Sequence, residues 1–379
     1  LFNYIDTHQD EFVQDLKDWI AIPSDSSDPL LRGDLSKMVE ITAESLQALG
    51  ATVNLVDMGE EKEIPVNIKF IIEGVEETGS PGLEDLIKAN ASFFADVDYI
   101  VISDNLWLSR KPALTYGTRG SAYFFVEVEG GTKDLHSGTF GGIIHEAMRD
   151  LVYLLANLID SSGHILIPGI CDDVAPLTEE ERRLYENIDF DLEEHKNNGG
   201  VNTFLYSTKE DLLMHRWRYP SLTIHGIEGA FCGTGTKTVI PAKVIGKFSM
   251  RQVPNMDPSV VEKQVTDYLE AKFSERKSPN KIKVKMVIGA KPWLADMNEP
   301  QYLAARRAVK RVFNLEADMI RAGGTIPIAK TLEDVLGKSV MLLGIGGPDD
   351  APHGQNEKIS KYNYIEGTKL YASYLQELS

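Results

Sequence analysis

A strand pattern that ends in two adjacent glutamates constrains the fold of this chain more than any other stretch. Apolar and polar residues alternate over residues 66–73, as expected for a β-strand with one buried face. A turn with Glu76 and Glu77 follows, and Ser80-Pro81 predicts a helix start, with Ser as the cap and Pro as the first helical residue. The glutamates are therefore expected at the C-terminal end of a strand, where ligands bind in open α/β sheets.

Two neighbouring carboxylates in a turn suit metal-assisted hydrolysis. They point in different directions, so one can bind a cation while the other accepts a proton from the water that the cation activates. The alternative is that Glu76 and Glu77 are an ordinary solvated pair, which is the common situation for acidic residues. The rest of the sequence must decide between these interpretations.

The acidic composition bears on the class of partner. Among 379 residues there are 39 Lys and Arg against 57 Asp and Glu, a formal net charge of −18. This balance argues against nucleic acid and anionic membranes as partners, because both attract basic surfaces. No apolar run approaches the roughly 18 residues that would suggest a membrane span. The two cysteines, Cys171 and Cys232, leave the compartment open.

Apolar periodicity predicts an α/β protein with an insertion. Helices are predicted over 9–20, 34–49, 143–158, 257–273, 301–312 and 364–378, and helical pieces with loops over 178–200. Strands are predicted over 98–103, 123–128, 221–224, 244–253, 281–288 and 340–343. The order of elements towards both ends predicts a mostly parallel sheet, and the antiparallel strands with two helices between them predict an inserted α+β domain.

Two further strands end in residues that can bind a metal. Asp104 follows the strand at 98–103, and His353 lies in the glycine-rich loop after the strand at 340–343. A single such Asp is more often a turn residue, and a lone loop His is more often polar surface. Together with the glutamate pair they become candidate ligands, since imidazole and carboxylate suit zinc.

Several motifs in a fixed order resemble the carnosine dipeptidase branch of the M20 metallopeptidases over nearly the whole chain. They are Glu73–Ser80 (EGVEETGS), Ser103–Asn105 (SDN), Asp134–Gly138 (DLHSG), Met214–Pro220 (MHRWRYP), Lys237–Pro241 (KTVIP), the His353 loop and Gln355–Lys358 (QNEK). The resemblance implies a metallodipeptidase that hydrolyses carnosine-like Xaa-His dipeptides and uses two zinc or manganese ions per subunit. It also implies a catalytic domain formed by residues 1–120 and 294–379, and a lid at 121–293 through which a homodimer forms.

The resemblance assigns metal-site roles by position. Glu76 would be the general base that takes a proton from the attacking water. Glu77 and His353 would hold one metal ion, and Asp104 the other.

It assigns substrate roles in the same way. His136, reaching in from the lid of the partner subunit, would bind substrate and stabilise the oxyanion. Arg251, Thr238 and Thr325 would surround the C-terminal carboxylate of the dipeptide, for which arginine is a suitable planar partner.

One segment departs from the family pattern. Members carry Tyr-Gly-His-x-Asp, whose histidine is a metal ligand, and later an aspartate before Lys-Gly that bridges both metals. Both belong between Asp57 and Ile64, so several dozen residues are missing there. Catalytic zinc normally takes three protein ligands. The chain is therefore either a dipeptidase whose sequence lacks this segment here, or a shortened non-catalytic homologue that keeps the fold and the dimer. A hydrolase for another amide, such as an N-acyl amino acid, is a third interpretation.

Two stretches bear on location. Ile102–Trp107 and Thr325–Lys330 are closer to the secreted members of the branch than to the cytosolic ones. We therefore expect secretion, with the cytoplasm as the alternative.

Overall fold

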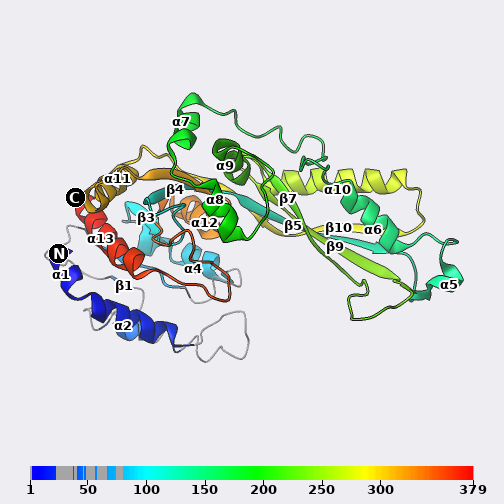
Figure 1. The fold of residues 1–379 in the computed structure, drawn as a ribbon, viewed down its shortest axis with the longest axis horizontal. Coiled ribbons are helices and arrows are strands. Elements are labelled where there is room, and N and C mark those ends of the chain that lie inside the picture. The colour runs from blue at the N-terminus through cyan, green and yellow to red at the C-terminus, as the bar shows by residue number, and fades with distance from the viewer. Residues whose placement is uncertain are drawn as a thin grey trace. The chain divides into compact units, whose positions relative to one another are not determined.

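The computed structural model describes residues 2–22, 37, 41–45, 47, 56–57, 66–73 and 80–378. The chain divides into two compact units (Figure 1). Unit 1 comprises Leu1–Tyr116, Ala295–Ile320 and Thr331–Ser379, and unit 2 comprises Gly117–Leu294 and Arg321–Lys330. The boundaries lie within a few residues of 120 and 293, whereas the membership of 321–330 in unit 2 was not predicted. The roles of catalytic domain and lid stay predictions.

Unit 1 combines a mixed sheet with helices. Its elements are α1 (Phe2–Thr7), α2 (Gln9–Ile20), β1 (Val56–Asp57), β2 (Lys69–Phe70), α4 (Leu83–Ala89), η3 (Ala91–Phe94), β3 (Tyr99–Ile102), β4 (Ala113–Thr118), α11 (Pro300–Phe313), β12 (Asp318–Ala322), α12 (Pro327–Leu336), β13 (Ser339–Leu342) and α13 (Lys361–Glu377), of which β4, β12 and α12 run on into unit 2. The described class is α/β, as predicted.

Strand directions in this sheet are mixed. β13 runs parallel to β3, with Ser339 opposite Tyr99, and antiparallel to β4, with Leu342 opposite Thr115. β1 and β2 are also antiparallel. The predicted predominance of parallel strands is not seen among these pairs. β3 and β4 lie on the two sides of β13 and run in opposite directions, so only one neighbour of β13 is parallel to it.

The core of unit 1 fixes the position of β13. Val340, Met341 and Leu342 have no exposed surface. Tyr302 of α11 is equally buried, and its hydroxyl donates a hydrogen bond to the carbonyl oxygen of Thr115 at 3.0 Å. Burial of these apolar side chains stabilises the strand from which the His353 loop begins.

Unit 2 is built on a four-stranded antiparallel sheet in the order β10-β5-β9-β7. Its elements are β5 (Gly120–Glu129), β6 (Leu135–His136), α5 (Ser137–Phe140), α6 (Ala147–Ala156), α7 (Glu179–Asn187), α8 (Leu192–Gly199), α9 (Lys209–Trp217), β7 (Ser221–Glu228), β8 (Val239–Ile240), β9 (Lys243–Gln252), α10 (Pro258–Glu275), β10 (Lys281–Ala290) and β11 (Trp293–Leu294). The predicted α+β character of the insertion is confirmed.

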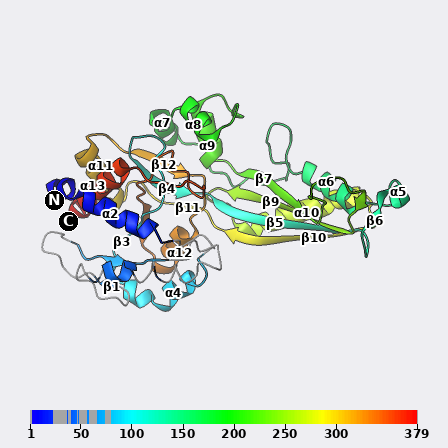
Figure 2. The ribbon, with the colours of Figure 1, turned by 60° about the horizontal axis from the view of Figure 1, so that its bottom comes forward.

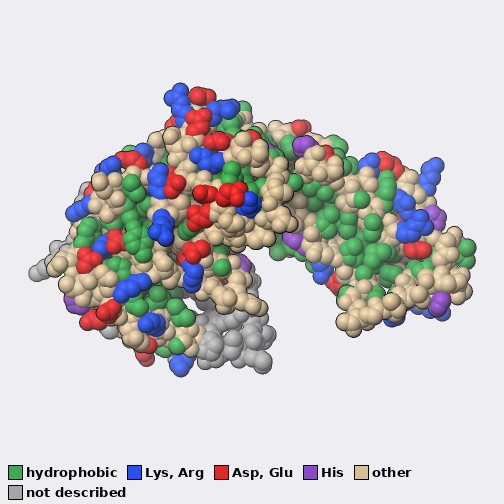
Figure 3. All heavy atoms as spheres, viewed as in Figure 1, with side chains coloured by type: hydrophobic (Ala, Val, Ile, Leu, Met, Phe, Trp, Pro, Cys, Tyr) green, Lys and Arg blue, Asp and Glu red, His purple; other side chains and the backbone are tan. Residues whose placement is uncertain are grey.

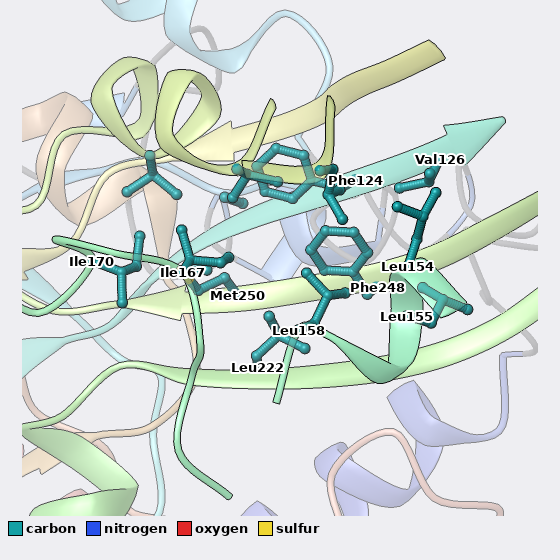
Figure 4. Packing of buried hydrophobic residues seen from close by; sticks show 14 of the residues in the cluster. Phe124, Val126, Leu154, Leu155, Leu158, Ile167, Ile170, Leu222, Phe248 and Met250 are labelled. Atoms are coloured by element: carbon teal, nitrogen blue, oxygen red, sulfur yellow. The ribbon is translucent and has the colours of Figure 1, made fainter. Parts of the chain in front are cut away.

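The core of unit 2 lies between this sheet and helices α6 and α10 (Figure 4). β5 alternates strictly between buried and partly exposed residues, as a sheet with one covered face requires. Phe124 of β5 and Phe248 of β9 stack with ring centroids 5.1 Å apart. A Cβ at Gly246 would lie 2.8 Å from Leu151 of α6, so the glycine allows the helix to approach the strand.

Most predicted elements are confirmed, but one predicted strand is too long and one predicted helix start is wrong. Of the strand predicted over 66–73 only β2 (Lys69–Phe70) forms, and Ile71 and Ile72 after it are exposed. The helix predicted over 34–49 lies mostly outside the described residues. α2 spans Gln9–Ile20, the predicted range. α4 begins at Leu83 with Gly82 as its N-cap, and no side chain caps it. Ser80 and Gly82 have φ values of 52° and 87°, so a left-handed turn precedes the helix and removes Ser80 from the cap position. In the part of the chain that the structure describes, no helix has the length and apolar character of a membrane span.

Candidate functional site

The ends of two parallel strands carry the candidate metal ligands of unit 1. Beyond β3 and β13 the two segments stay paired: Leu343 N donates to Ile102 O at 3.0 Å, and Trp107 N donates to Gly346 O at 2.8 Å. Asp104 lies in the first of these segments, and the second leads into the His353 loop. Both residues therefore belong to the same edge of the sheet, and both are exposed.

The His353 loop is ordered by its own polar contacts. The buried Asp350 accepts a hydrogen bond from Gly347 N at 2.6 Å. Lys358 bonds Asp349 at 2.8 Å and lowers the pKa of that carboxyl through the hydrogen bond. His353 itself has φ 61°, a left-handed conformation that is uncommon for a residue with a side chain. These contacts hold the loop backbone from which the His353 side chain extends.

The described residues supply part of a metal site. Asp104 and His353 offer carboxylate and imidazole, which are donors suited to zinc. Glu76 and Glu77 lie outside the described residues. Among the residues that are described, no group of three or more His, Cys, Asp or Glu side chains could hold a metal ion. The donor types therefore fit the metal, while a full set of ligands is not assembled by the described residues alone.

Two predicted substrate residues of unit 2 contact each other. The Arg251 guanidinium Nη1 donates to Thr325 Oγ1 at 2.6 Å, and both residues are half-buried. Arg251 lies near the end of β9, opposite both Ser121 and Ser221. Burial lowers the pKa of Arg251. This pair offers a guanidinium and a hydroxyl in one place, which is the chemistry that a carboxylate requires.

The other two predicted substrate residues form a second, separate pair. His136 of β6 lies opposite Val239 of β8, and Ser137 N donates to the carbonyl oxygen of Thr238 at 3.1 Å. His136 Nδ1 accepts a hydrogen bond from Gly138 N at 2.9 Å. His136 and Thr238 are both exposed.

The two pairs lie towards opposite ends of one sheet. The register places Ser121 opposite Arg251 and Glu129 opposite Lys243. Eight residues of antiparallel strand separate these positions, about 27 Å at about 3.4 Å per residue. β6 and α5 lie beyond the Glu129 end (Figure 2). Within one chain, Thr238 and His136 therefore do not meet Arg251 and Thr325, although the sequence grouped Thr238 with them.

Two arginines that the sequence did not single out surround the first pair. Arg119 is 9% exposed, and its pKa is lowered to about 10, first by burial and then by the charges of Arg251 and Arg216. Arg216 lies near the end of α9, and burial lowers its pKa as well. The signal that could have found Arg119 is an arginine between glycines, Gly117-Thr118-Arg119-Gly120, in an otherwise apolar strand region.

Comparisons with known proteins agree with these features. The family model described as Peptidase family M20/M25/M40 matches residues 42–377. Beta-Ala-His dipeptidase of Rattus norvegicus is 50% identical over 467 residues, which cover all of this chain and 95% of the relative. Cys-Gly metallodipeptidase DUG1 of Saccharomyces cerevisiae is 48% identical over 331 residues, 86% of this chain and 69% of the relative. The crystal structure of human carnosine dipeptidase 1 superimposes with a TM-score of 0.89 at 49% identity, and covers all of this chain and 98% of the other.

The comparisons bear on two predictions. The alignment with the rat relative counts 467 positions and this chain 379 residues, so 88 positions of that relative have no counterpart here. This agrees in size with the several dozen residues predicted to be missing. The prediction of secretion is wrong, because the yeast Cys-Gly metallodipeptidase matches at nearly the same identity as the Beta-Ala-His dipeptidases. The likeness is not specific to the secreted members, so it does not support secretion.

Proposed function

The chain belongs to peptidase family M20/M25/M40 and groups there with metallodipeptidases, and on this premise we propose that its substrates are carnosine-like dipeptides of the form Xaa-His. The observation that carries the proposal is the common edge of β3 and β13, to which Asp104 and the His353 loop both belong. Open α/β sheets bind their ligands at the carboxyl ends of their strands.

Zinc or manganese, two ions per subunit, is the proposed cofactor. Asp104, His353 and Glu77 would be the ligands that this chain contributes. When bound, the metal lowers the pKa of water and polarises the peptide carbonyl. Glu76 would accept the proton of the attacking water and pass it to the leaving amine.

The substrate groups of unit 2 would bind the other parts of the dipeptide. Arg251 and Thr325, already joined at 2.6 Å, would hold the C-terminal carboxylate. His136 would donate a hydrogen bond to the oxyanion of the tetrahedral intermediate. His136 lies beyond the Glu129 end of the sheet, and about 27 Å of strand separates that end from Arg251. His136 would therefore serve the site of a second copy, together with its neighbour Thr238.

A homodimer is therefore part of the proposal. Hydrophobic side chains gather on the face of unit 2 around α6 (Figure 3). Val152 of α6 and Ile143 in the preceding loop are 50% and 75% exposed. Exposed apolar patches of this kind mark contact surfaces.

A shortened, non-catalytic homologue is the second candidate. It is favoured by the 88 positions of the rat relative that have no counterpart in this chain. Two further metal ligands are expected between Asp57 and Ile64, where residues are missing. Such a chain would keep the fold and the dimer but bind metal weakly.

One experiment separates the two candidates. The purified 379-residue chain is equilibrated with zinc or with manganese, its metal content is measured by mass spectrometry, and histidine release from β-alanyl-histidine is followed. The dipeptidase predicts bound metal and turnover that a chelator abolishes. Glu76→Gln should keep the metal and lose turnover. A chain that binds neither ion and releases no histidine is the shortened homologue.

A further inference from the structure

Three arginine side chains of unit 2 come together without a carboxylate to balance them. Arg119 interacts electrostatically with both Arg216 and Arg251, and burial lowers the pKa of each of the three. The nearby buried carboxylate, Glu181, is already paired with Arg218 and Arg321. Within the described part of the chain none of the three guanidinium groups has an acidic partner. Buried unpaired charge is costly, so such a cluster implies a ligand of opposite sign.

Arg119 organises the cluster. Its backbone N–H donates to the carbonyl oxygens of Ala322 and Gly324 at 3.2 and 3.1 Å, and its Nε donates to Gly323 O at 2.9 Å. Its Nη1 donates to Ser221 Oγ at 2.9 Å. Arg119 therefore donates its hydrogen bonds to neutral acceptors and holds the loop that carries Thr325.

Arg216 is the member with unused donors. Its Nη1 is completely buried and has no hydrogen-bond partner. Its side chain makes no hydrogen bond or ion pair within the described residues. A buried donor without an acceptor is destabilising, because it has lost its hydrogen bonds to water. An oxyanion that enters beside this guanidinium would supply the missing acceptor.

The loop Gly323–Thr325 connects the surroundings of Arg216 with the pair formed by Arg251 and Thr325. A Cβ at Gly323 would lie 3.3 Å from both Arg216 Cγ and Arg119 Nη2. Thr325, two residues further, accepts the hydrogen bond of Arg251. Two residues span at most about 7 Å. Arg216 therefore lies beside Gly323 at one end of this short loop segment, and Arg251 contacts Thr325 at the other.

We propose that Arg216 is a further carboxylate-binding residue, which together with Arg251 and Thr325 forms a two-guanidinium receptor for the C-terminal carboxylate of the dipeptide, with Arg119 as the residue that positions them. The identity of the ligand rests on the proposed function. A planar carboxylate has two oxygens, and each can accept from a different guanidinium. An amide in the same place would bring one acceptor and one donor, and the donor would face positive charge.

Binding to the metal-free chain tests this proposal, because no hydrolysis then interferes. Isothermal titration compares β-alanyl-histidine with its C-terminal amide on the wild type, on Arg216→Met and on Arg182→Met. Arg182 is an exposed arginine of the same unit, on α7. The wild type should prefer the acid to the amide. Arg216→Met should weaken binding of the acid by about 10- to 150-fold, the worth of a hydrogen bond to a charged group, and leave binding of the amide unchanged.

The control and a second variant make the result decisive. Arg182→Met should bind both ligands as the wild type does. Arg216→Lys keeps the charge without the planar fork and should show a smaller loss, so it replaces Arg216→Met if that variant does not fold. Equal affinity of Arg216→Met and wild type for the acid overturns the proposal, as does a wild type that binds acid and amide equally. If discrimination by Arg216 is found but the metal-loaded chain releases no histidine, the proposed function fails and the receptor stands.

Discussion

The two ends of the sheet in unit 2 differ in how many of their side-chain contacts one chain provides by itself. At the Arg251 end, half-buried side chains contact each other directly and Arg119 ties the Thr325 loop to β7. At the His136 end, the imidazole is exposed, and its one hydrogen bond within the described residues comes from Gly138 N. The first end is organised by its own chain, whereas the second presents its functional group outward. Under the proposed function, one sheet would serve two sites, one with each end.

The largest effect is expected at the Arg251 end. Arg251→Met removes the guanidinium that would hold the substrate carboxylate and leaves Thr325 without its donor. We expect kcat/KM for β-alanyl-histidine to fall by about 30- to 4,000-fold, the range for truncation of one partner of a buried charge pair. Steady-state kinetics with Arg182→Met as the control measures this. A loss of less than threefold would show that this end does not bind substrate.

The next effect is expected at the His136 end and has a different kinetic signature. His136→Ala should lower kcat by about 100- to 1,000-fold, as removal of an oxyanion donor does, while KM changes little. The hydrogen bond with Gly138 N is local, so thermal stability should be kept. A rise in KM at constant kcat would place His136 in ground-state binding instead.

A smaller effect is expected for the residue that organises the Arg251 end without touching substrate. Arg119→Met leaves the carbonyl oxygen of Gly323 without its donor, which should cost about 1–3 kcal/mol of unfolding free energy. The displaced Thr325 loop should raise KM with kcat little changed. Chemical denaturation and kinetics on the same preparation test both expectations. Unchanged stability with a lost kcat would contradict a positioning role.

The smallest effect concerns pH at the same end. Burial, and then the charge of Arg216, lower the pKa of His195 below its ordinary value of 6.5. The imidazole of the unfolded chain therefore takes up a proton at higher pH than that of the folded chain. The contribution of His195 to the free energy of unfolding is fully present above about pH 6.5 and is lost as pH falls through the folded pKa. His195→Gln should flatten this dependence. Equal pH dependence of the variant and the wild type in chemical denaturation would exclude His195 as the cause.

The sequence predicts local structure where periodicity is strong. The helix over 9–20 and the strands of unit 2 follow directly from apolar spacing. The start of α4 is missed because Gly82 adopts a left-handed conformation that the Ser-Pro pattern does not reveal.

The candidate site is predictable only in part, for a physical reason. Motifs identify Arg251, Thr325, Thr238 and His136, but they carry no information about distance along a sheet. The register of β5 with β9 decides that Thr238 lies far from Arg251. The burial of Arg119 and Arg216 depends on how 321–330 joins unit 2, a long-range contact that local sequence does not encode.

Complementation between two inactive variants tests most directly whether the two ends serve different sites. Arg251→Met and His136→Ala chains are each purified, mixed in equal amounts, dissociated and reassociated. About half of the dimers then contain one chain of each variant, and each of these dimers has one intact site of two. About a quarter of wild-type activity should therefore return. Activity no higher than that of the separate variants would contradict the account, because both ends would then act within one chain.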